Sequence, residues 1–190
     1  MVQGPWSIHK SYKKGFLTTK HKITKRVLQR AIISVLLVSS SSLIVTIANS
    51  SEIIRIYDGD TFTLNTKEKV RLLQIDTPEI SPSECYAVEA KAELEKLLNL
   101  PGKLILKTDP KIEAKDRFGR LLRYVFVGDV NINLRMVEIG AAAPYFYKKE
   151  RGLFADELWK AALNAKVNKI GLWRNCPNSK LKPNYALSTN

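Results

Sequence analysis

The pattern of hydrophobic and polar residues divides the chain into one uninterrupted apolar stretch and a longer region of short, alternating elements. Residues 31–48 contain no charged residue and are mostly apolar around a run of serines at 39–42. An apolar stretch of this length lies at the boundary between a signal-peptide core and a short membrane span. From Glu52 onward, apolar residues recur at the periods of strands and amphipathic helices, which predicts a folded domain.

Short β-rich runs open this domain. The first two are separated by Asp58-Gly59, a dipeptide typical of tight hairpin turns, so the first three runs predict an antiparallel meander. Two more runs with the same composition follow later in the chain. The five predicted strands are 53–57, 61–64, 69–75, 104–107 and 121–127.

Helical periodicity appears between and after these runs. Apolar residues at helical spacing end at Pro101-Gly102 and predict a helix over 85–99. Asn131 can cap a short helix to residue 139, and a longer amphipathic helix runs from residue 153 to near Gly171. The pattern therefore predicts an α+β fold, a small five-stranded barrel with three helices. It also predicts an N-terminal hydrophobic helix and a flexible tail over 175–190.

The charge of the chain is unevenly distributed. The formal net charge is +13, but eight of the positive residues lie in segment 1–30, where no acidic residue occurs, so residues 52–190 carry +5. This excess is compatible with a nucleic acid partner or with a merely soluble basic surface. The basic segment before 31–48 predicts that the domain is outside the cytoplasm, either secreted after cleavage behind Ala48 or anchored in the membrane.

The position of the histidines removes several classes of enzyme. His9 and His21 both lie in the basic segment, so the folded domain contains no histidine. This excludes a Ser-His-Asp triad, a Cys-His nucleophile, a histidine base and the usual zinc sites. Hydrolytic chemistry in the domain would have to use carboxylates, arginines and an oxygen-ligated metal.

Two acidic turns offer such ligands. Asp58-Gly-Asp60-Thr61 could be only a hairpin turn, and Phe62 excludes an EF-hand loop because an oxygen ligand is needed there. A second acidic turn, 75–79, also follows a strand. Carboxylates at two strand ends and a backbone carbonyl beside Thr77 would form a site of hard oxygen ligands suited to Ca²⁺.

Two arginines could bind phosphate near these turns. Arg71 shares a strand face with Leu73 and Ile75, so it needs an anionic partner, and a purely structural ion pair is the alternative. Arg120 follows a glycine turn, and two guanidinium groups near a metal would form a phosphate clamp. A straight strand would place Arg71 roughly 16 Å from Asp76, so this hypothesis requires a bend.

Five blocks occur in an order that resembles the staphylococcal nuclease (thermonuclease) family over residues 52–174. They are Tyr57-Asp-Gly-Asp-Thr61, Arg71-Leu-Leu-Gln-Ile-Asp-Thr-Pro-Glu79, Asp116-Arg-Phe-Gly-Arg120, Gly140 with Tyr145-Phe-Tyr147, and Gly171-Leu-Trp173. The resemblance implies a five-stranded OB-type β-barrel with three helices. It also implies a calcium-dependent endonuclease that hydrolyses DNA and RNA and leaves 3′-phosphate ends.

The resemblance also assigns roles to individual residues. Metal ligands are Asp60, Asp76 and the Thr77 carbonyl; catalytic residues are Arg71, Glu79 and Arg120; substrate-binding residues are Arg117, Tyr145 and Tyr147. Glu79 would orient or deprotonate the attacking water, while the arginines would stabilise charge on the phosphate. The sequence departs from the family at Phe118 and Arg117, where a tyrosine and a lysine are usual, and is one residue short between Gly140 and Tyr145. Core packing is the alternative role for the two tyrosines.

The chain contains two cysteines, both in the predicted domain. Cys85 and Cys176 flank the helical part of the domain, and in an exported protein a disulfide between them is expected. A monomer is expected.

One alternative function is a non-catalytic OB-fold nucleic-acid-binding module, against which the retained carboxylates argue. A PD-(D/E)xK nuclease would need 89–91 on a strand, where a helix is predicted, and a membrane-tethered structural protein has only 31–48 in its favour.

Overall fold

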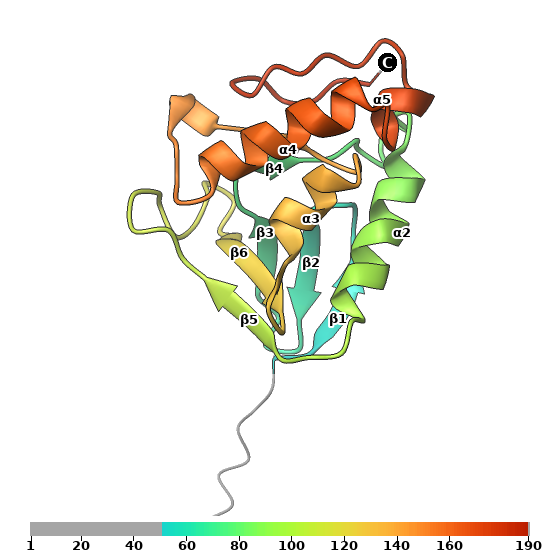
Figure 1. Ribbon diagram of the computed structural model, residues 1–190. Coiled ribbons are helices and arrows are strands. Elements are labelled where there is room, and N and C mark those ends of the chain that lie inside the picture. The colour runs from blue at the N-terminus through green and yellow to red at the C-terminus, as the bar shows by residue number, and fades with distance from the viewer. Residues whose placement is uncertain (1–50, 190) are drawn as a thin grey trace, which may run out of the picture. The chain divides into compact units, whose positions relative to one another are not determined.

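The computed structural model describes residues 51–189 (Figure 1). These residues belong to one compact unit. The basic segment 1–30 and the apolar stretch 31–48, predicted as a signal peptide core or membrane anchor, lie outside the described residues. Among the described residues, no helix has the length and apolar character that crossing a membrane requires.

The centre of the domain is a mixed sheet. Its first three strands form the predicted antiparallel meander, and β3 then pairs in parallel with β6, which pairs antiparallel with β5. The strand order is therefore β1-β2-β3-β6-β5, and a short strand, β7, also pairs with β6. The strands are β1 Ile53–Ile56, β2 Thr61–Leu64, β3 Lys69–Leu72, β5 Leu104–Lys107, β6 Leu121–Val127 and β7 Val130–Asn131.

The sheet is not closed into the predicted barrel. Among residues 51–189, β1 and β5 form the two ends of the strand path and do not pair with each other. A hollow of about 510 Å³ lies beside β1 instead, lined also by Leu98 near the end of a helix and by Leu104 at the start of β5. The OB-like arrangement is therefore open at this edge among the described residues.

The three predicted helices are present as α2 Ala87–Leu98, α3 Ile132–Glu138 and α4 Ala155–Val167. Helix α2 begins later than predicted because Tyr86 has a left-handed backbone with φ 73°. Asn131 caps α3 as expected, its side chain accepting a hydrogen bond from the N–H of Leu134. Two short helical turns, η1 Tyr147–Lys149 and α5 Leu172–Asn175, complete the helical structure.

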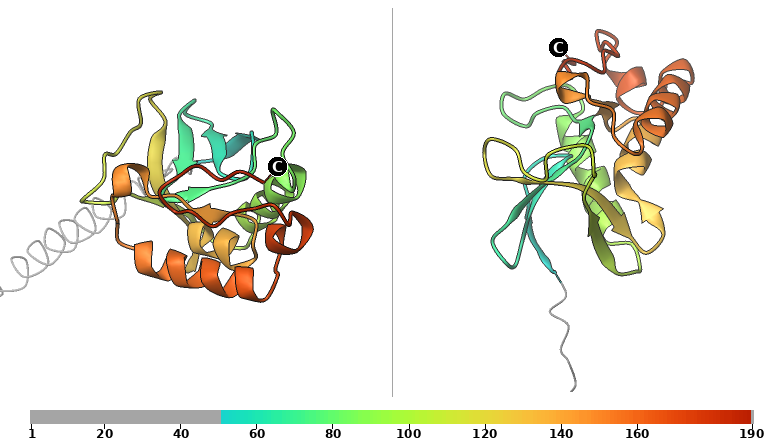
Figure 2. Two further views of the ribbon diagram at one scale, coloured as in Figure 1. Left: turned by 90° about the horizontal axis from the view of Figure 1, so that it is seen from above. Right: turned by 90° about the vertical axis from the view of Figure 1, so that its left-hand side faces the viewer.

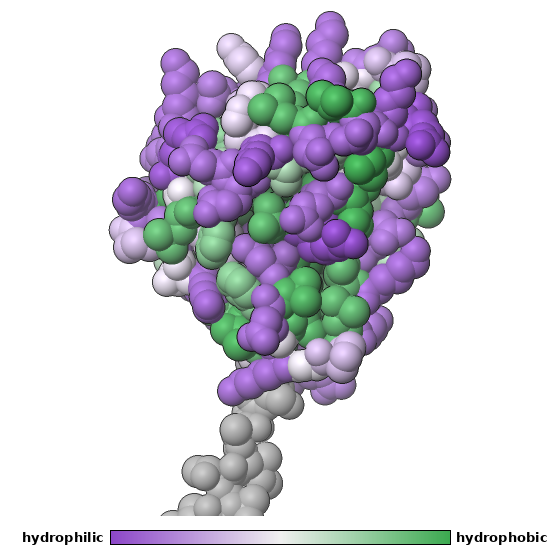
Figure 3. All heavy atoms as spheres, in the orientation of Figure 1, coloured by the Kyte–Doolittle hydropathy of each residue, from purple (hydrophilic) through white to green (hydrophobic). Residues whose placement is uncertain are grey.

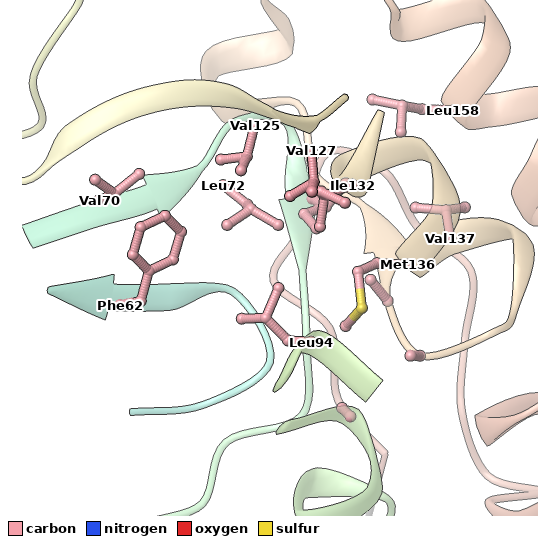
Figure 4. Packing of buried hydrophobic residues seen from close by; sticks show 14 of the residues in the cluster. Phe62, Val70, Leu72, Leu94, Val125, Val127, Ile132, Met136, Val137 and Leu158 are labelled. Carbon is pink, nitrogen blue, oxygen red and sulfur yellow. The ribbon is translucent and has the colours of Figure 1, made fainter. Parts of the chain in front are cut away.

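The core lies between the sheet and the helices (Figures 1, 2 and 4). Phe62 and Val70 from adjacent strands meet Leu94 of α2 and Met136 of α3, and all four side chains are fully buried. Most of the surface on the face drawn in Figure 3 is hydrophilic. Burial of these side chains supplies most of the driving force for placing the helices against the sheet.

The predicted strand 69–75 is broken by a bend. Strand β3 ends at Leu72, and a separate short strand, β4 Ile75–Asp76, pairs with β8 Ala143–Pro144. Gln74 lies at the bend with φ 61°. Left-handed backbone is unfavourable for a non-glycine residue, so surrounding contacts must maintain this conformation.

Buried hydrogen bonds supply those contacts. The Tyr124 hydroxyl donates to Gln74 Oε1 at 2.9 Å, and the Gln74 side-chain amide donates to the carbonyl of Glu150 at 2.8 Å. The N–H of Gly152 also donates to Gln74 Oε1, at 3.1 Å. Asp109 joins this network, since its carboxylate accepts hydrogen bonds from the N–H of Leu153 and lies 3.0 Å from the Tyr124 hydroxyl oxygen.

The C-terminal tail, predicted to be flexible, is packed against the domain. Residues 177–189 contain no helix or strand, but they fold back over the domain instead of extending from it (Figure 2). Leu187 and Thr189 are buried, and the segment begins at a disulfide between Cys85 and Cys176, whose Cα atoms are 5.9 Å apart. Sequence composition gave no sign of this packing because the contacts that hold the segment to the domain join residues far apart in the chain.

Candidate active site

An arginine between two carboxylates forms the centre of the candidate site. Arg71 Nη1 lies 2.8 Å from Asp60 Oδ2, and Arg71 Nη2 lies 2.6 Å from Asp76 Oδ1. The Arg71 side chain is only 12% exposed. One guanidinium therefore joins two carboxylates that are 16 residues apart in the sequence.

The local fold explains how these three residues meet. Asp60 immediately precedes β2, and Thr61 at the start of β2 is paired with Arg71 on β3. The bend after Leu72 turns the chain back, so that Arg71 Nη1 also donates to the carbonyl of Ile75 at 2.9 Å. A phosphate clamp beside the metal required a bend between Arg71 and Asp76, and the left-handed Gln74 provides it.

The two acidic turns touch through Thr77. Its N–H and its hydroxyl both donate to Asp60 Oδ2, at 3.2 and 3.3 Å. Gly59 packs against the same threonine, because an added Cβ would lie 2.8 Å from Thr77 Cγ2. The predicted metal residues Asp60, Asp76 and Thr77 are thus brought together.

The chemistry of these groups fits a hard divalent cation. Two carboxylates and the main-chain carbonyl of Thr77 offer only oxygen ligands, which Ca²⁺ prefers. Among residues 51–189 there is no cluster of three or more His, Cys, Asp or Glu side chains that could hold a metal. A bound cation would therefore depend on the carboxylate pair, the carbonyl and water.

Negative charge is crowded at this centre. Burial, followed by repulsion from Asp60, raises the pKa of Asp58 to about 7. Burial also raises the pKa of Asp76 to about 6, although Arg71 opposes the change. Burial alone would lower the pKa of Arg71, but Asp60 and Asp76 outweigh it and the pKa rises. Arg71 is permanently charged, and the surrounding carboxylates favour the binding of a further cation.

Glu79 lies at the exposed edge of this centre. Its N–H donates to Glu84 Oε2 at 2.9 Å, and the N–H of Glu84 donates to the Glu79 carbonyl at 3.0 Å. Partial burial and then the charge of Asp60 raise the pKa of Glu79, while Arg71 and Arg120 lower it. Glu79 is thus within electrostatic reach of both predicted catalytic arginines.

A cleft of about 370 Å³ adjoins the acidic centre through Arg71. The three predicted substrate-binding residues all line it, together with both predicted catalytic arginines: Arg71, Arg117, Arg120, Tyr145 and Tyr147. Asp60, Asp76 and Glu79 are not among its lining residues. Arg71 is therefore shared between a cation-attracting centre and a cationic, aromatic cleft.

Asp116 orients the second arginine. Arg120 Nε lies 2.6 Å from Asp116 Oδ2, and Asp116 Oδ1 accepts hydrogen bonds from the N–H groups of Phe118 and Arg120, both at 2.9 Å. The terminal nitrogens of Arg120 have no hydrogen-bond partner in the described part of the chain. Phe118 is 69% exposed, with the guanidinium of Arg117 4.6 Å from its ring centroid.

The Tyr-Phe-Tyr run divides its aromatic rings between core and cleft. Phe146 is buried, whereas Tyr145 is partly exposed and Tyr147 is 58% exposed. The rings of Tyr145 and Tyr147 lie 6.3 Å apart. Core packing, the alternative raised for the tyrosines, applies to the phenylalanine between them.

Four residues contribute to the site without having been assigned a role from the sequence. Asp58 and Asp116 lie inside the quoted blocks, so their acidic character beside Asp60 and Arg120 was the available signal. Gln74 also lies inside a quoted block, but nothing in its neighbours indicated a positive φ, and Leu187 lies outside all the blocks. The N–H of Leu187 donates to Asp76 Oδ2 at 2.7 Å across 111 residues of sequence.

The fold and the site define an α+β protein of OB-like topology with a two-carboxylate centre beside a cleft suited to phosphate esters. A model of the family described as "Staphylococcal nuclease homologue" matches residues 69–175. The chain belongs to the staphylococcal nuclease family.

Individual relatives agree with this membership. The chain is 32% identical over 139 residues to an uncharacterized endonuclease of Haemophilus influenzae, covering 71% of each chain. It is 33% identical over 127 residues to the thermonuclease of Staphylococcus intermedius, covering 63% of this chain and 73% of that protein. It is 32% identical over 126 residues to the SPbeta prophage-derived endonuclease YokF of Bacillus subtilis, covering 63% of this chain but only 42% of YokF. An uncharacterized Bacillus anthracis protein is covered over 59% of its length, so the chain spans about half of these last two relatives.

Proposed function

We propose that the domain is a calcium-dependent endonuclease that hydrolyses DNA and RNA and leaves 3′-phosphate ends. The observation that carries the proposal is the position of Arg71. It pairs with Asp60 and Asp76 and also lines the cleft that contains Arg120. Family membership and the endonuclease names of the relatives support the same activity.

Asp60, Asp76 and the Thr77 carbonyl would hold Ca²⁺, which as a Lewis acid would polarise a phosphate oxygen. Arg71 is engaged with both carboxylates. A bound cation would share the charge of these carboxylates and would free donors of Arg71 for phosphate. Its planar guanidinium can then donate two parallel hydrogen bonds to phosphate oxygens.

The remaining groups would divide the proton and charge transfers. Glu79, exposed and acceptor-only when ionised, would orient a water molecule and accept its proton during attack on phosphorus. Arg120, oriented by Asp116, would donate from its terminal nitrogens to the phosphate or to the departing 5′ oxygen. Arg117, Tyr145 and Tyr147 would bind the nucleotide in the cleft by charge and by stacking.

An assay of residues 49–190 on single-stranded DNA and on RNA tests the proposal. Cutting should occur with Ca²⁺, should stop with chelator, and should leave ends that a polymerase extends only after 3′-phosphatase treatment. Arg71→Ala and Glu79→Ala should each lower kcat/KM at least about 100-fold. Lys160→Ala, on an exposed position of α4, is the matched control and should cut normally.

The non-catalytic nucleic-acid-binding module remains the competing function, because an arginine- and tyrosine-lined cleft can bind nucleic acid without a metal. Binding of DNA with no cutting under any metal condition would favour it. Unchanged cutting by Arg71→Ala and Glu79→Ala would instead reject the proposed site while leaving an activity to be explained.

We further propose that the domain acts outside the cytoplasm as a monomer, with residues 31–48 serving as a signal-peptide core or as an anchor. The disulfide between Cys85 and Cys176 supports this location, because such bonds persist in oxidising compartments. Cell fractionation and the mass of the mature N-terminus would test the location. Light scattering of the purified domain would test the oligomeric state.

A further inference from the structure

Residues 177–189, which we name the C-terminal strap, contact the candidate active site at several points. In Figures 1 and 2 the strap runs from α5 over the end of the domain that contains β4. The carbonyl of Pro183 accepts a hydrogen bond from the N–H of Phe146, between the two cleft tyrosines. The strap therefore contacts the segment that carries the two cleft tyrosines before it reaches the acidic centre.

The contact with the acidic centre is made by the main chain of Leu187. Its N–H donates to Asp76 Oδ2 at 2.7 Å, while Asp76 Oδ1 binds Arg71 at 2.6 Å. These are the only hydrogen bonds of the Asp76 side chain among residues 51–189. Each carboxylate oxygen thus has one partner that fixes the rotation of the group, and each keeps a further lone pair for a cation.

The position of this N–H is fixed by the packing of the Leu187 side chain. The Leu187 side chain is buried in a small apolar cluster with Trp173, Cys176 and Ala143. Ala143 is paired with Asp76 across β4 and β8. Two residues later, the Thr189 hydroxyl donates to the carbonyl of Cys85 at 3.0 Å, beside the disulfide. The donor is consequently held by the same cluster that holds the strand carrying Asp76.

We infer that the C-terminal strap is part of the active site and that Leu187 is a positioning residue for cation binding. Its N–H orients the Asp76 carboxylate toward the cation that the proposed function assigns to it, so the inference rests on that function. Groups that orient metal ligands in this way commonly change metal affinity 10- to 100-fold when removed. Without the donor, Asp76 Oδ2 would be buried with no partner and the carboxylate would turn toward Arg71 or solvent.

The most direct test exchanges this single N–H for an oxygen. Cys176 allows a synthetic peptide of residues 176–190, with an ester in place of the Leu187 amide, to be ligated to residues 49–175 and oxidised. Calorimetric titration of the metal-free protein with Ca²⁺ is the main measurement. Leu187→Pro removes the same donor genetically, and the ester protein decides the question if that variant does not fold.

Two further variants separate the donor from the rest of the strap. Leu187→Ala keeps the N–H and removes the buried side chain, and Thr189→Val removes the hydroxyl that binds the Cys85 carbonyl. We expect the ester to raise the Kd for Ca²⁺ about 10-fold or more, and Thr189→Val to leave it within about twofold. At saturating Ca²⁺, kcat of the ester protein should stay within about threefold, since Arg71, Glu79 and Arg120 are unchanged.

Each result has a defined meaning. Calcium affinity of the ester protein within twofold of the unmodified protein would overturn the inference while leaving the proposed nuclease intact. An equal loss of affinity in Thr189→Val would also overturn it, because the effect would then belong to the strap as a whole. Absence of both Ca²⁺ binding and cutting in the unmodified protein would overturn the proposed function and this inference together.

Discussion

Arg71 Nη2 lies 2.6 Å from Asp76 Oδ1, although a straight strand would separate these residues by roughly 16 Å. The left-handed backbone of Gln74 closes this distance, and buried hydrogen bonds to Tyr124 and Glu150 maintain it. The acidic centre therefore depends on a network that contributes no ligand to it.

Replacement of Arg71 by lysine should show that the planar guanidinium is needed as well as the charge. One ammonium cannot span Asp60 and Asp76 as the guanidinium does, and it cannot donate two parallel hydrogen bonds to a phosphate. We expect Arg71→Lys to lower kcat/KM on single-stranded DNA about 100-fold or more. Steady-state cleavage with Ca²⁺ measures the change.

Arg71→Ala provides the comparison. It leaves two buried carboxylates without their cation, which should destabilise the metal-free protein by about 3 kcal/mol. Saturating Ca²⁺ should recover more stability in this variant than in the unmodified protein, because the added ion supplies the missing positive charge. Equal calcium-induced shifts in thermal midpoint would contradict the shared centre.

Gly152→Ala should loosen the network around the bend. A Cβ at this position would overlap Asp109 Oδ2 and would lie 2.5 Å from the Tyr124 hydroxyl and 2.8 Å from Gln74 Oε1. We expect a loss of about 3 kcal/mol in the free energy of unfolding, measured in urea.

Gly119→Ala separates steric overlap from backbone strain. Gly119 has φ +79° but no atom within 4 Å of the added Cβ, so its substitution should cost only about 1 kcal/mol. If the two alanine variants were equally stable, crowding at Gly152 would not be what restricts that position.

The sequence was sufficient for the local elements of the fold but not for its long-range closure. Hydrophobic periodicity located α2 and α4, the capping residue Asn131 located α3, and the Asp58-Gly59 turn correctly placed β1 beside β2. These features depend on neighbouring residues. The open edge between β1 and β5 depends instead on whether two strands far apart in the sequence pair, which hydrophobic periodicity does not encode.

The same distinction applies to the site. The order of the motifs assigned Asp60, Asp76 and Arg71 to one predicted site, and the structure places Arg71 in contact with both carboxylates. The bend between Arg71 and Asp76 had to be assumed and could not be located at Gln74, since nothing in the neighbouring residues predicts a positive φ there. Leu187 was assigned to a tail that looked unstructured. Its role could not be predicted because its binding group is a main-chain N–H, which is present at every residue except proline.

Arg117→Ala should weaken substrate binding with little effect on the chemical step. Arg117 lines the cleft and is exposed, so its contact with the substrate should be mainly with phosphate. We expect a several-fold rise in KM for single-stranded DNA and a salt dependence of binding that is weaker by about 0.7 in logarithmic slope. The free energy of unfolding should change by less than about 0.5 kcal/mol.

Lys160→Ala controls for a general loss of positive charge. It removes one charge from α4, away from the residues that line the cleft. The salt slope of this variant should match that of the unmodified protein. An equal decrease in both variants would mean that overall charge, and not the cleft, governs binding.

The disulfide should contribute substantially to stability. Cys85 and Cys176 are 91 residues apart, and closing a loop of this length restricts the unfolded chain by an amount worth about 4 kcal/mol. The double variant Cys85→Ser, Cys176→Ser should therefore unfold at a clearly lower urea concentration. Adding reductant to the unmodified protein should lower its midpoint toward the same value, and a midpoint insensitive to reductant would contradict this account.

Asp116→Asn should separate the orientation of Arg120 from its charge. Burial alone would raise the pKa of Asp116, but hydrogen bonds from the Arg120 side chain and from two backbone N–H groups outweigh it, and the pKa is lowered below its ordinary value of 3.8. A depressed carboxyl pKa stabilises the folded protein fully above the unfolded value and no longer does so once pH falls through the folded value. The unmodified protein should therefore exceed Asp116→Asn in unfolding free energy by about 1 kcal/mol from pH 5 to 8.

This stability difference should shrink as the pH falls below 3.8, because protonation of Asp116 then removes the ion pair in the unmodified protein as well. Asparagine keeps an oxygen for the two backbone N–H groups but loses the charged partner of Arg120 Nε. Cleavage near neutral pH should thus fall about 10-fold through kcat, since Arg120 is retained but less well oriented. A difference in stability that stays constant from pH 3 to 8 would mean that the ion pair contributes nothing and that the loop is held by its backbone hydrogen bonds alone.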